Sequence, residues 1–291
     1  MAVTALAPIT WGSTYFVTRH YLPDATPLWG AAIRALPAGL VLLAVARQLP
    51  RGAWWWRSAV LGVLNFGGFF ALLYVTALWL PSSVASSIMA LAPLVLAACG
   101  WALLGERPTS WMAVGAGVGI VGVLLIVGAG AGAVNPWGVL TSLVALVMSS
   151  IGAVLNKKWS AGLPLLPITA WQATIGGLVL VVVAGLVEGP PPVLGGAALA
   201  GFAYISLIAT ALASLCWFGG LARLAAGTVG IIGLLNPVTG VLLGVLAGGE
   251  VLTTLQIAGI GLVLGGILLG GRSGRQASRG VAGRRRSVPR A

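Results

Sequence analysis

The sequence has very little charge. Asp and Glu number only four and Lys and Arg sixteen among 291 residues, so charged residues make up 7 % of the chain. A soluble globular domain carries about 25 % charged residues. Hydrophobic residues here reach 59 %, with a mean hydropathy of +1.05. Little of this chain can therefore face water, and the composition indicates an integral membrane protein.

Residue types that carry catalysis or bind metals are equally scarce. The chain has a single histidine, His20, and two cysteines, Cys99 and Cys216. An enzyme site would need a nucleophile with a base, a carboxylate pair or metal ligands, and one histidine, two separated cysteines and four acids cannot make most of these sites. The phosphate-binding pattern Gly-x-x-x-x-Gly-Lys-Ser/Thr is absent too. The sequence argues against an enzyme and an ATP-driven pump, and it predicts no cofactor and no metal site.

The net charge of +12 is unevenly distributed. Seven of the sixteen basic residues lie in the last 20 residues, within a Gly- and Ser-rich tail, residues 271–291. We expect this tail to be disordered and cytoplasmic. A basic tail after a membrane helix favours contact with anionic lipid of the inner leaflet. No nucleic-acid-binding motif accompanies it, so nucleic acid is not an expected partner.

Ten apolar stretches approach or reach the length of about 17–25 residues that crosses a membrane. Turn-forming Pro, Gly and Asn residues separate them. The predicted fold is therefore an all-α integral membrane protein with ten transmembrane helices, near residues 2–19, 28–47, 58–79, 83–104, 110–129, 136–156, 167–187, 196–217, 228–247 and 252–270.

The Lys and Arg residues of the loops predict the orientation. With a cytoplasmic N-terminus, fourteen basic residues lie in the inside segments and only Arg19 lies outside, while Arg34 falls within the second span. Both termini are therefore expected in the cytoplasm, in a multi-pass protein of the plasma membrane.

The chain contains one passage twice. Residues 93–125 align without gaps with residues 237–269, at an offset of 144 residues. Five spans is an odd number, so the second half would cross the membrane in the opposite direction. We therefore predict two inverted five-helix repeats, residues 1–130 and 131–270, an arrangement typical of secondary transporters. The shared residues include Pro93/Pro237, Gly105/Gly249, Glu106/Glu250 and Thr109/Thr253.

Short motifs follow one another in a characteristic order. They are Trp11-Gly12-Ser13 with Phe16, Arg34, Ala71-Leu72-Leu73-Tyr74, Pro93, Gly105-Glu106-Arg107-Pro108-Thr109, Pro237 and Gly249-Glu250. In this order, and over residues 1 to about 270, the chain resembles the EamA-domain branch of the drug/metabolite transporter superfamily. The resemblance implies ten helices in two inverted repeats around a central cavity. It also implies transport of small metabolites, often export of amino acids.

Polar and aromatic residues inside the spans are candidates for the substrate pathway. A polar group in the membrane needs a partner, which can be substrate or another helix. Serine can instead bond to its own helix, and the aromatic residues can serve core packing. The candidates are Trp11, Ser13, Asn65, Tyr74, Ser86, Ser149, Ser214, Trp217 and Asn236.

Five further residues are candidates for structural or gating roles. Pro93 and Pro237 lie within the fourth and ninth spans and interrupt helix hydrogen bonding, which predicts hinges or plain kinks. Arg34 is the only basic residue well inside a span, and we expect a structural or gating role for it. Glu106 and Glu250 end the fourth and ninth spans, where helix capping and loop fixing are expected rather than proton transfer.

The sequence thus predicts a secondary transporter of small organic metabolites such as amino acids. It would be an exporter that works by alternating access through a central cavity. A channel or facilitator-type pore is the alternative, although neither charged rings nor a carbonyl filter motif is evident. A membrane-embedded enzyme is a more distant alternative.

Overall fold

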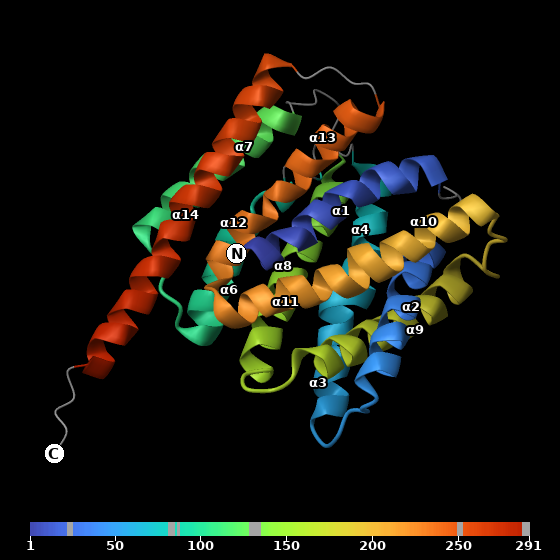
Figure 1. Ribbon diagram of the computed structural model, residues 1–291. Helices are drawn as coiled ribbons and strands as arrows, with labels where there is room; N and C mark the ends of the chain where they lie inside the picture. The colour runs from blue at the N-terminus through green and yellow to red at the C-terminus, as the bar shows by residue number, and fades with distance from the viewer. Residues whose placement is uncertain (22–25, 81–84, 86–87, 128–134, 249–252, 287–291) are drawn as a thin grey trace.

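The protein is all-helical over the residues that the structure describes, and these contain no strand (Figure 1). The computed structural model describes residues 1–21, 26–80, 85, 88–127, 135–248 and 253–286. The first half consists of α1 (Ala2–Tyr21), α2 (Pro27–Ala46), α3 (Trp54–Gly62), η1 (Val63–Gly67), α4 (Gly68–Trp79), α6 (Ala92–Leu104) and α7 (Ser110–Val127). The second half consists of α8 (Pro136–Trp159), α9 (Leu165–Val187), α10 (Gly196–Ser206), η2 (Leu207–Leu212), α11 (Ala213–Arg223), α12 (Ala226–Gly233), α13 (Leu235–Gly248) and α14 (Thr254–Arg286).

Five helical segments in the described residues are long and apolar enough to cross a membrane. They are Pro27–Ala46, Trp54–Thr76, Pro136–Trp159, Leu165–Val187 and Gly196–Arg223. The other predicted spans coincide with α1 and with four shorter apolar helices, Ala92–Leu104, Ser110–Ile126, Ala226–Gly240 and Thr254–Gly270. The all-α membrane fold is confirmed at this level, and the ten-span arrangement stays a prediction.

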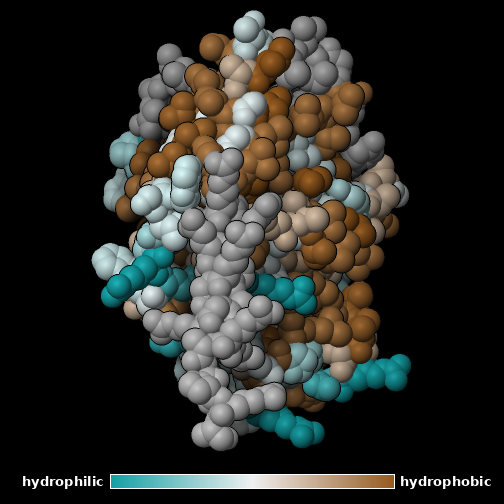
Figure 2. Space-filling view, turned by 60° about the vertical axis from the view of Figure 1, so that its left-hand side comes forward, coloured by the Kyte–Doolittle hydropathy of each residue, from teal (hydrophilic) through white to brown (hydrophobic). Residues whose placement is uncertain are grey.

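The outer surface suits a lipid environment. Large apolar side chains are widely exposed, for example Leu186 at 83 %, Leu246 at 80 % and Leu268 at 74 %. Figure 2 shows apolar side chains over most of one face, with the strongly hydrophilic ones in its lower half. Water would penalise so much contiguous apolar surface, whereas the hydrocarbon region of a bilayer would not.

Two helices contain a π-helical turn, η1 and η2. A π turn is a local widening of an α-helix that accommodates an extra residue, and such turns are frequent at functional sites. The first begins at Val63 and the second at Leu207, which differ by the repeat offset of 144 residues. Hydrophobic periodicity gives no signal for either turn.

The helices are interrupted just before the two repeated prolines. Residues 90 and 91 form a turn before α6, and residue 234 separates α12 from α13. Pro93 and Pro237 are then the second and third residues of their helices. Proline is tolerated in a first helical turn because its missing N–H has no partner there. Each proline thus follows a break between two helices, and a hinge at these positions stays a prediction.

The most extensive helix pairs are α7 with α14 and α2 with α9, each of which lies side by side in Figure 1. Glycines bring the α7 and α14 backbones together. A Cβ atom on Gly115 would lie 2.6 Å from the Gly266 carbonyl oxygen, and one on Gly122 would lie 2.7 Å from the Gly259 carbonyl oxygen. Small residues permit this separation in membrane helix pairs.

Helix α14 continues beyond the last predicted span to Arg286, while the disorder of residues 271–291 stays a prediction. Extending a helix that already exists costs far less than starting one. The segment also contains Arg, Gln and Ala, which favour helix.

Candidate functional site

Aromatic and hydroxyl groups of α1 meet the helices α10 and α11. The Trp11 and Trp217 rings lie 5.1 Å apart between centroids, at a tilt of 55°. Two residues further along α1, the Ser13 hydroxyl lies 2.6 Å from the Tyr204 hydroxyl. All four side chains are half-buried. The structure thus brings together three of the predicted pathway residues, and it adds Tyr204, which sequence reasoning did not select.

The same part of α1 contacts the interruption between α12 and α13. A Cβ atom on Gly12 would lie 2.4 Å from the Asn236 carbonyl oxygen, so the two backbones are in direct contact. Asn236 is half-buried in the first turn of α13. Three consecutive residues of α1 therefore contact three other helices: Trp11 contacts Trp217 of α11, Gly12 approaches the Asn236 backbone of α13, and Ser13 contacts Tyr204 of α10.

Arg34 of α2 faces the second half of the chain. Its Nε donates a 2.9 Å hydrogen bond to the Thr210 hydroxyl, which belongs to η2. Its guanidinium carbon lies 4.4 Å from the centroid of the Phe70 ring. Tyr74 approaches the same helix, with its hydroxyl 3.1 Å from where a Cβ of Gly30 would lie. These contacts hold Arg34 within the protein, and its structural or gating role stays a prediction.

Asn65 belongs to a buried polar chain. Its amide nitrogen donates to Gln172 Oε1 at 2.8 Å, and the Gln172 nitrogen lies 3.4 Å from Asn156 Oδ1. Gln172 and Asn156 are 0 % and 1 % exposed. This placement favours hydrogen bonding between helices over contact with substrate. Asn156 was not among the predicted residues, because it lies at the end of a span beside two lysines.

The other predicted residues are the pathway candidates Ser149, Ser214 and Ser86 and the helix-end residue Glu250. The Ser149 hydroxyl donates to the Leu146 carbonyl of its own helix at 3.1 Å, which is the local alternative expected for serine. Ser214 is 6 % exposed in α11. Ser86 and Glu250 lie outside the described residues.

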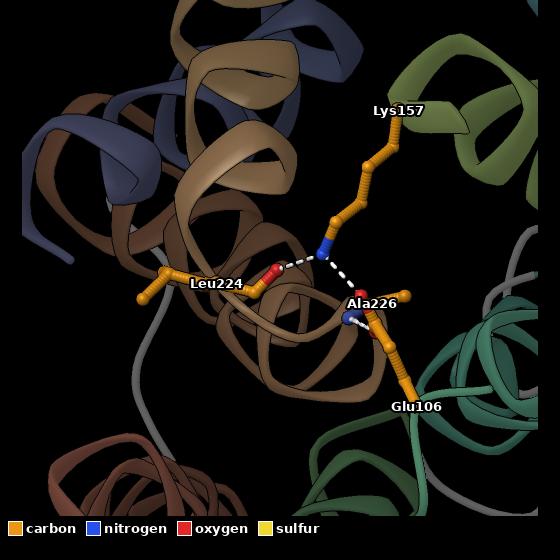
Figure 3. A network of polar contacts seen from close by, with 4 residues as sticks. All are labelled: Glu106, Lys157, Leu224 and Ala226. Atoms are coloured by element: carbon orange, nitrogen blue, oxygen red, sulfur yellow. Dashed lines mark hydrogen bonds and ion pairs between the residues drawn. The ribbon is translucent and has the colours of Figure 1, made fainter. Parts of the chain in front are cut away.

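Glu106 connects the two halves of the chain at one end of the molecule (Figure 3). Its Oε1 forms an ion pair with Lys157 at the end of α8. Its Oε2 accepts a 2.8 Å hydrogen bond from the backbone N–H of Ala226, and Lys157 Nζ also donates to the Leu224 carbonyl at 2.6 Å. We call Glu106, Lys157, Leu224 and Ala226 the cross-repeat latch. Its two charged side chains are partly buried.

The latch refines the capping role predicted for Glu106. We expected Glu106 to cap or fix the helices next to it in sequence. It instead accepts from the first residue of α12, where a carboxylate is favoured by the unpaired N–H groups and the helix dipole. Lys157 and Ala226 are 51 and 120 residues away in sequence, so no local pattern could identify them.

Glu188 of the second half caps a helix of the first half, which is the reverse of the Glu106 arrangement. It ends α9 in the second half, and its two carboxylate oxygens accept from the backbone N–H groups of Leu28 and Trp29 at 2.8 and 2.9 Å. The Trp29 indole N–H donates to the Gly189 carbonyl at 3.0 Å. Each half thus supplies a glutamate to a helix start in the other half. Among the described residues, no group of three or more His, Cys, Asp and Glu side chains could hold a metal ion.

A comparison with family models matches the chain to the EamA-like transporter family over residues 1–128 and 136–271. Protein PecM of Dickeya dadantii is 36 % identical over 265 residues, which cover 90 % of this chain and 89 % of that protein. The uncharacterized inner membrane transporter YedA of Escherichia coli K12 is 27 % identical, with coverage of 90 % and 87 %.

Two other matches concern function and fold separately. A probable amino-acid metabolite efflux pump of Salmonella typhimurium is 25 % identical, with coverage of 91 % of this chain and 92 % of the pump. A solved crystal structure superposes with a TM-score of 0.82 at 20 % identity, covering 95 % of this chain and 97 % of the other. At this identity the superposition establishes a shared fold only.

Proposed function

Because the chain belongs to the EamA-like transporter family, we propose that it exports small organic metabolites such as amino acids across the cell membrane, as a secondary transporter. The relatives support the class, since one is named as an inner membrane transporter and another as a probable amino-acid metabolite efflux pump. The low content of acids, histidine and cysteine supports transport over catalysis.

The observation that carries the proposed mechanism is that irregular helix features recur at the repeat offset. The two π turns begin 144 residues apart, and so do the interruptions at Ala90 and Leu234. Paired interruptions at corresponding positions are the usual sign of a transporter site between inverted repeats. We therefore place the alternating-access site where the interruptions of the second half, η2 and the break before α13, contact α1.

The contacts between helices recur when each helix is replaced by its counterpart in the other half. At the repeat offset, α1 corresponds to α8, α4 to α11 and α6 to α13. The α1–α13 contact then corresponds to α8–α6, and the α4–α8 contact corresponds to α11–α1; all four pairs are in contact. Inverted repeats with this property have two related conformations, one open to each side of the membrane.

The proposed substrate site consists of Trp11, Ser13, Tyr204, Trp217 and Asn236. Two indoles provide an apolar wall, while two hydroxyls and an amide provide hydrogen-bonding groups. A few polar groups in an aromatic setting suit a small amphipathic molecule. An amino acid or one of its derivatives has this combination of groups.

The cross-repeat latch would hold one end of the molecule closed. From the Lys and Arg distribution we assign this end, with both chain termini, to the cytoplasm. The latch ties Glu106 of the first half to α8 and the start of α12 in the second half. Opening the site toward the cytoplasm would require these contacts to separate.

Counterflow in proteoliposomes tests the proposal. Vesicles would be loaded with a pool of amino acids, and uptake of labelled amino acid would be followed for the wild type, Asn236→Ala and Ser149→Ala. Ser149 is the matched control because its hydroxyl is bonded within its own helix. We expect saturable, trans-stimulated uptake that Asn236→Ala weakens and Ser149→Ala preserves.

Other outcomes separate the alternatives. Flux without saturation or trans-stimulation would identify a channel. Absence of flux with every amino acid, from protein shown to be folded and inserted, would reject an amino-acid transporter.

A further inference from the structure

An arginine surrounded by tryptophans lies at the start of α3. The Arg57 guanidinium carbon is 5.6 Å from the ring centroids of both Trp54 and Trp56, and 5.8 Å from that of Trp159. The Trp56 and Trp159 rings are themselves edge to face at 5.3 Å. The guanidinium is thus held by the ends of two helices, α3 and α8.

The positive charge of Arg57 has no anionic partner within the described part of the chain. Its Nε is buried and has no hydrogen-bond partner there. The ion pair found there joins Lys157 to Glu106 instead. Indole rings attract the cation but offer its N–H groups no conventional acceptor. A guanidinium in this setting favours an external anion, especially a planar or tetrahedral oxyanion.

The surroundings match the interface between lipid headgroups and hydrocarbon. Trp55 and Trp56 are 56 % and 53 % exposed. Arg51 and Lys158 are exposed next to the tryptophans in sequence, and they add positive charge. Exposed tryptophans are enriched at this depth in membrane proteins, and basic residues beside them attract anionic lipid.

A shallow apolar groove lies on α9, the helix that packs against α3. Trp54 contacts Trp171 with centroids 5.7 Å apart, and the Trp171 indole donates to the Gln48 carbonyl at 2.7 Å. Positions 171, 175, 178, 179, 182 and 183 share one face of the helix at spacings of three and four. The groove is lined by Ile175, Leu178, Val179, Val182 and Val183. Its lining is entirely apolar, as an acyl chain requires.

We infer that this surface binds an anionic phospholipid, with the headgroup phosphate at Arg57 and an acyl chain along the α9 groove. Arg51 and Lys158 add attraction at the headgroup, and Trp55 and Trp56 lie at the level of the glycerol backbone. The guanidinium makes the site selective for an anionic headgroup, whereas the indoles and the groove accept any phospholipid. This site is separate from the basic tail and from the proposed transport site, so it depends on membrane insertion and not on transport.

The test is native mass spectrometry of the purified full-length protein in detergent. It would be titrated with phosphatidylglycerol or with phosphatidylcholine of the same acyl chains. The variants are Arg57→Gln and, as a matched control, Arg223→Gln, which removes an exposed arginine at the end of α11. We expect the wild type and Arg223→Gln to retain phosphatidylglycerol preferentially, and Arg57→Gln to bind it roughly tenfold more weakly. Phosphatidylcholine binding should change little.

Three results would overturn the assignment. They are equal retention of the two lipids by the wild type, equal losses in Arg57→Gln and Arg223→Gln, and displacement of phosphatidylglycerol by millimolar inorganic phosphate. The last result would indicate a site for free anions. If Arg57→Gln does not fold, the double variant Arg51→Gln/Lys158→Gln replaces it, because both side chains are exposed. That variant should also weaken phosphatidylglycerol binding selectively, and an unchanged preference would reject the site.

Discussion

Glu106 satisfies two different groups with its two carboxylate oxygens. One oxygen pairs with Lys157, and the other accepts from the backbone N–H at the start of α12. Lys157 in turn donates to the Leu224 carbonyl. Each charged side chain is therefore bound both to its partner and to the backbone. This geometry fixes which position must be acidic and which must be basic.

Single substitutions in the latch should destabilise the protein. Glu106→Gln and Lys157→Met each leave a partly buried charge without its partner, at a cost of about 1–2 kcal/mol. Lys158→Met is the matched control, because the neighbouring lysine is exposed. The thermal unfolding midpoint in detergent should fall for the first two variants only. A drop of equal size for Lys158→Met would show that general charge, rather than the latch, is responsible.

The charge-reversed double variant Glu106→Lys/Lys157→Glu distinguishes the latch from a simple ion pair. The reversal restores opposite charges but places an ammonium against the Ala226 N–H and a carboxylate against the Leu224 carbonyl. We expect its unfolding midpoint to be no higher than that of either single variant. Recovery of the wild-type midpoint would contradict the contribution of the backbone contacts.

The Asn65–Gln172–Asn156 chain gives a further prediction. Replacing Gln172 with Leu should leave the Asn65 amide without its acceptor and cost about 1–3 kcal/mol. Ser149→Ala removes only a hydrogen bond within one helix and should be nearly neutral. The comparison can be made by thermal unfolding of the two variants. Equal midpoints would mean that the polar chain contributes nothing to helix association.

At the scale of elements, the positions of glycine along a helix determine where a second helix can approach its backbone closely. In α7, Gly115 and Gly122 face the backbone of α14, whereas a Cβ atom on Gly117 would meet nothing within 4 Å. All three are glycines of the same helix, yet only Gly115 and Gly122 lie where the α14 backbone approaches α7 closely. Helix α7 therefore provides both the test positions and their control.

Gly122→Ala should separate α7 from α14 and cost about 1–3 kcal/mol, because the added methyl group meets backbone rather than a flexible side chain. Gly117→Ala should be neutral or stabilising by up to about 1 kcal/mol, since alanine favours helix. Thermal unfolding in the same detergent measures both. Stabilisation by Gly122→Ala would show that the two helices can separate without loss.

The helices themselves could be predicted from the sequence more readily than the contacts between them. Pro93 and Pro237 drew attention to two regions where one helix ends and another begins, because proline restricts the backbone wherever it occurs, and their hinge role stays a prediction. The partners of Glu106 were not predictable, because they depend on how helix ends 51 and 120 residues away come together. Tyr204 was missed for the same reason, since its significance lies in its contact with Ser13. The π turns leave no mark in hydrophobic periodicity.

At the scale of the whole molecule, the C-terminal segment contributes no residue to the proposed site. None of the residues proposed for substrate binding or the latch lies beyond Gly270. Its basic residues instead suit contact with anionic lipid.

Deletion of residues 274–291 should therefore leave the rate of counterflow unchanged. We expect the deletion to alter insertion or lipid contact, because seven basic residues lie in the last 20 and influence topology. Counterflow and protease accessibility in the same proteoliposomes measure the two effects. Loss of flux in correctly oriented protein would instead assign the tail a role in transport.

The glycine contacts between α7 and α14 have a kinematic consequence. Adding the repeat offset to Gly115 and Gly122 gives Gly259 and Gly266, which are the residues that they face in reverse order. If each residue is replaced by its counterpart in the other half, the Gly115–Gly266 contact becomes the Gly259–Gly122 contact, and the reverse also holds. In the proposed cycle, the two halves exchange conformations, and this helix pair can keep the same packing throughout. In such a cycle the α7–α14 pair would provide a stationary axis, and the motion would be confined to the helices around Pro93 and Pro237.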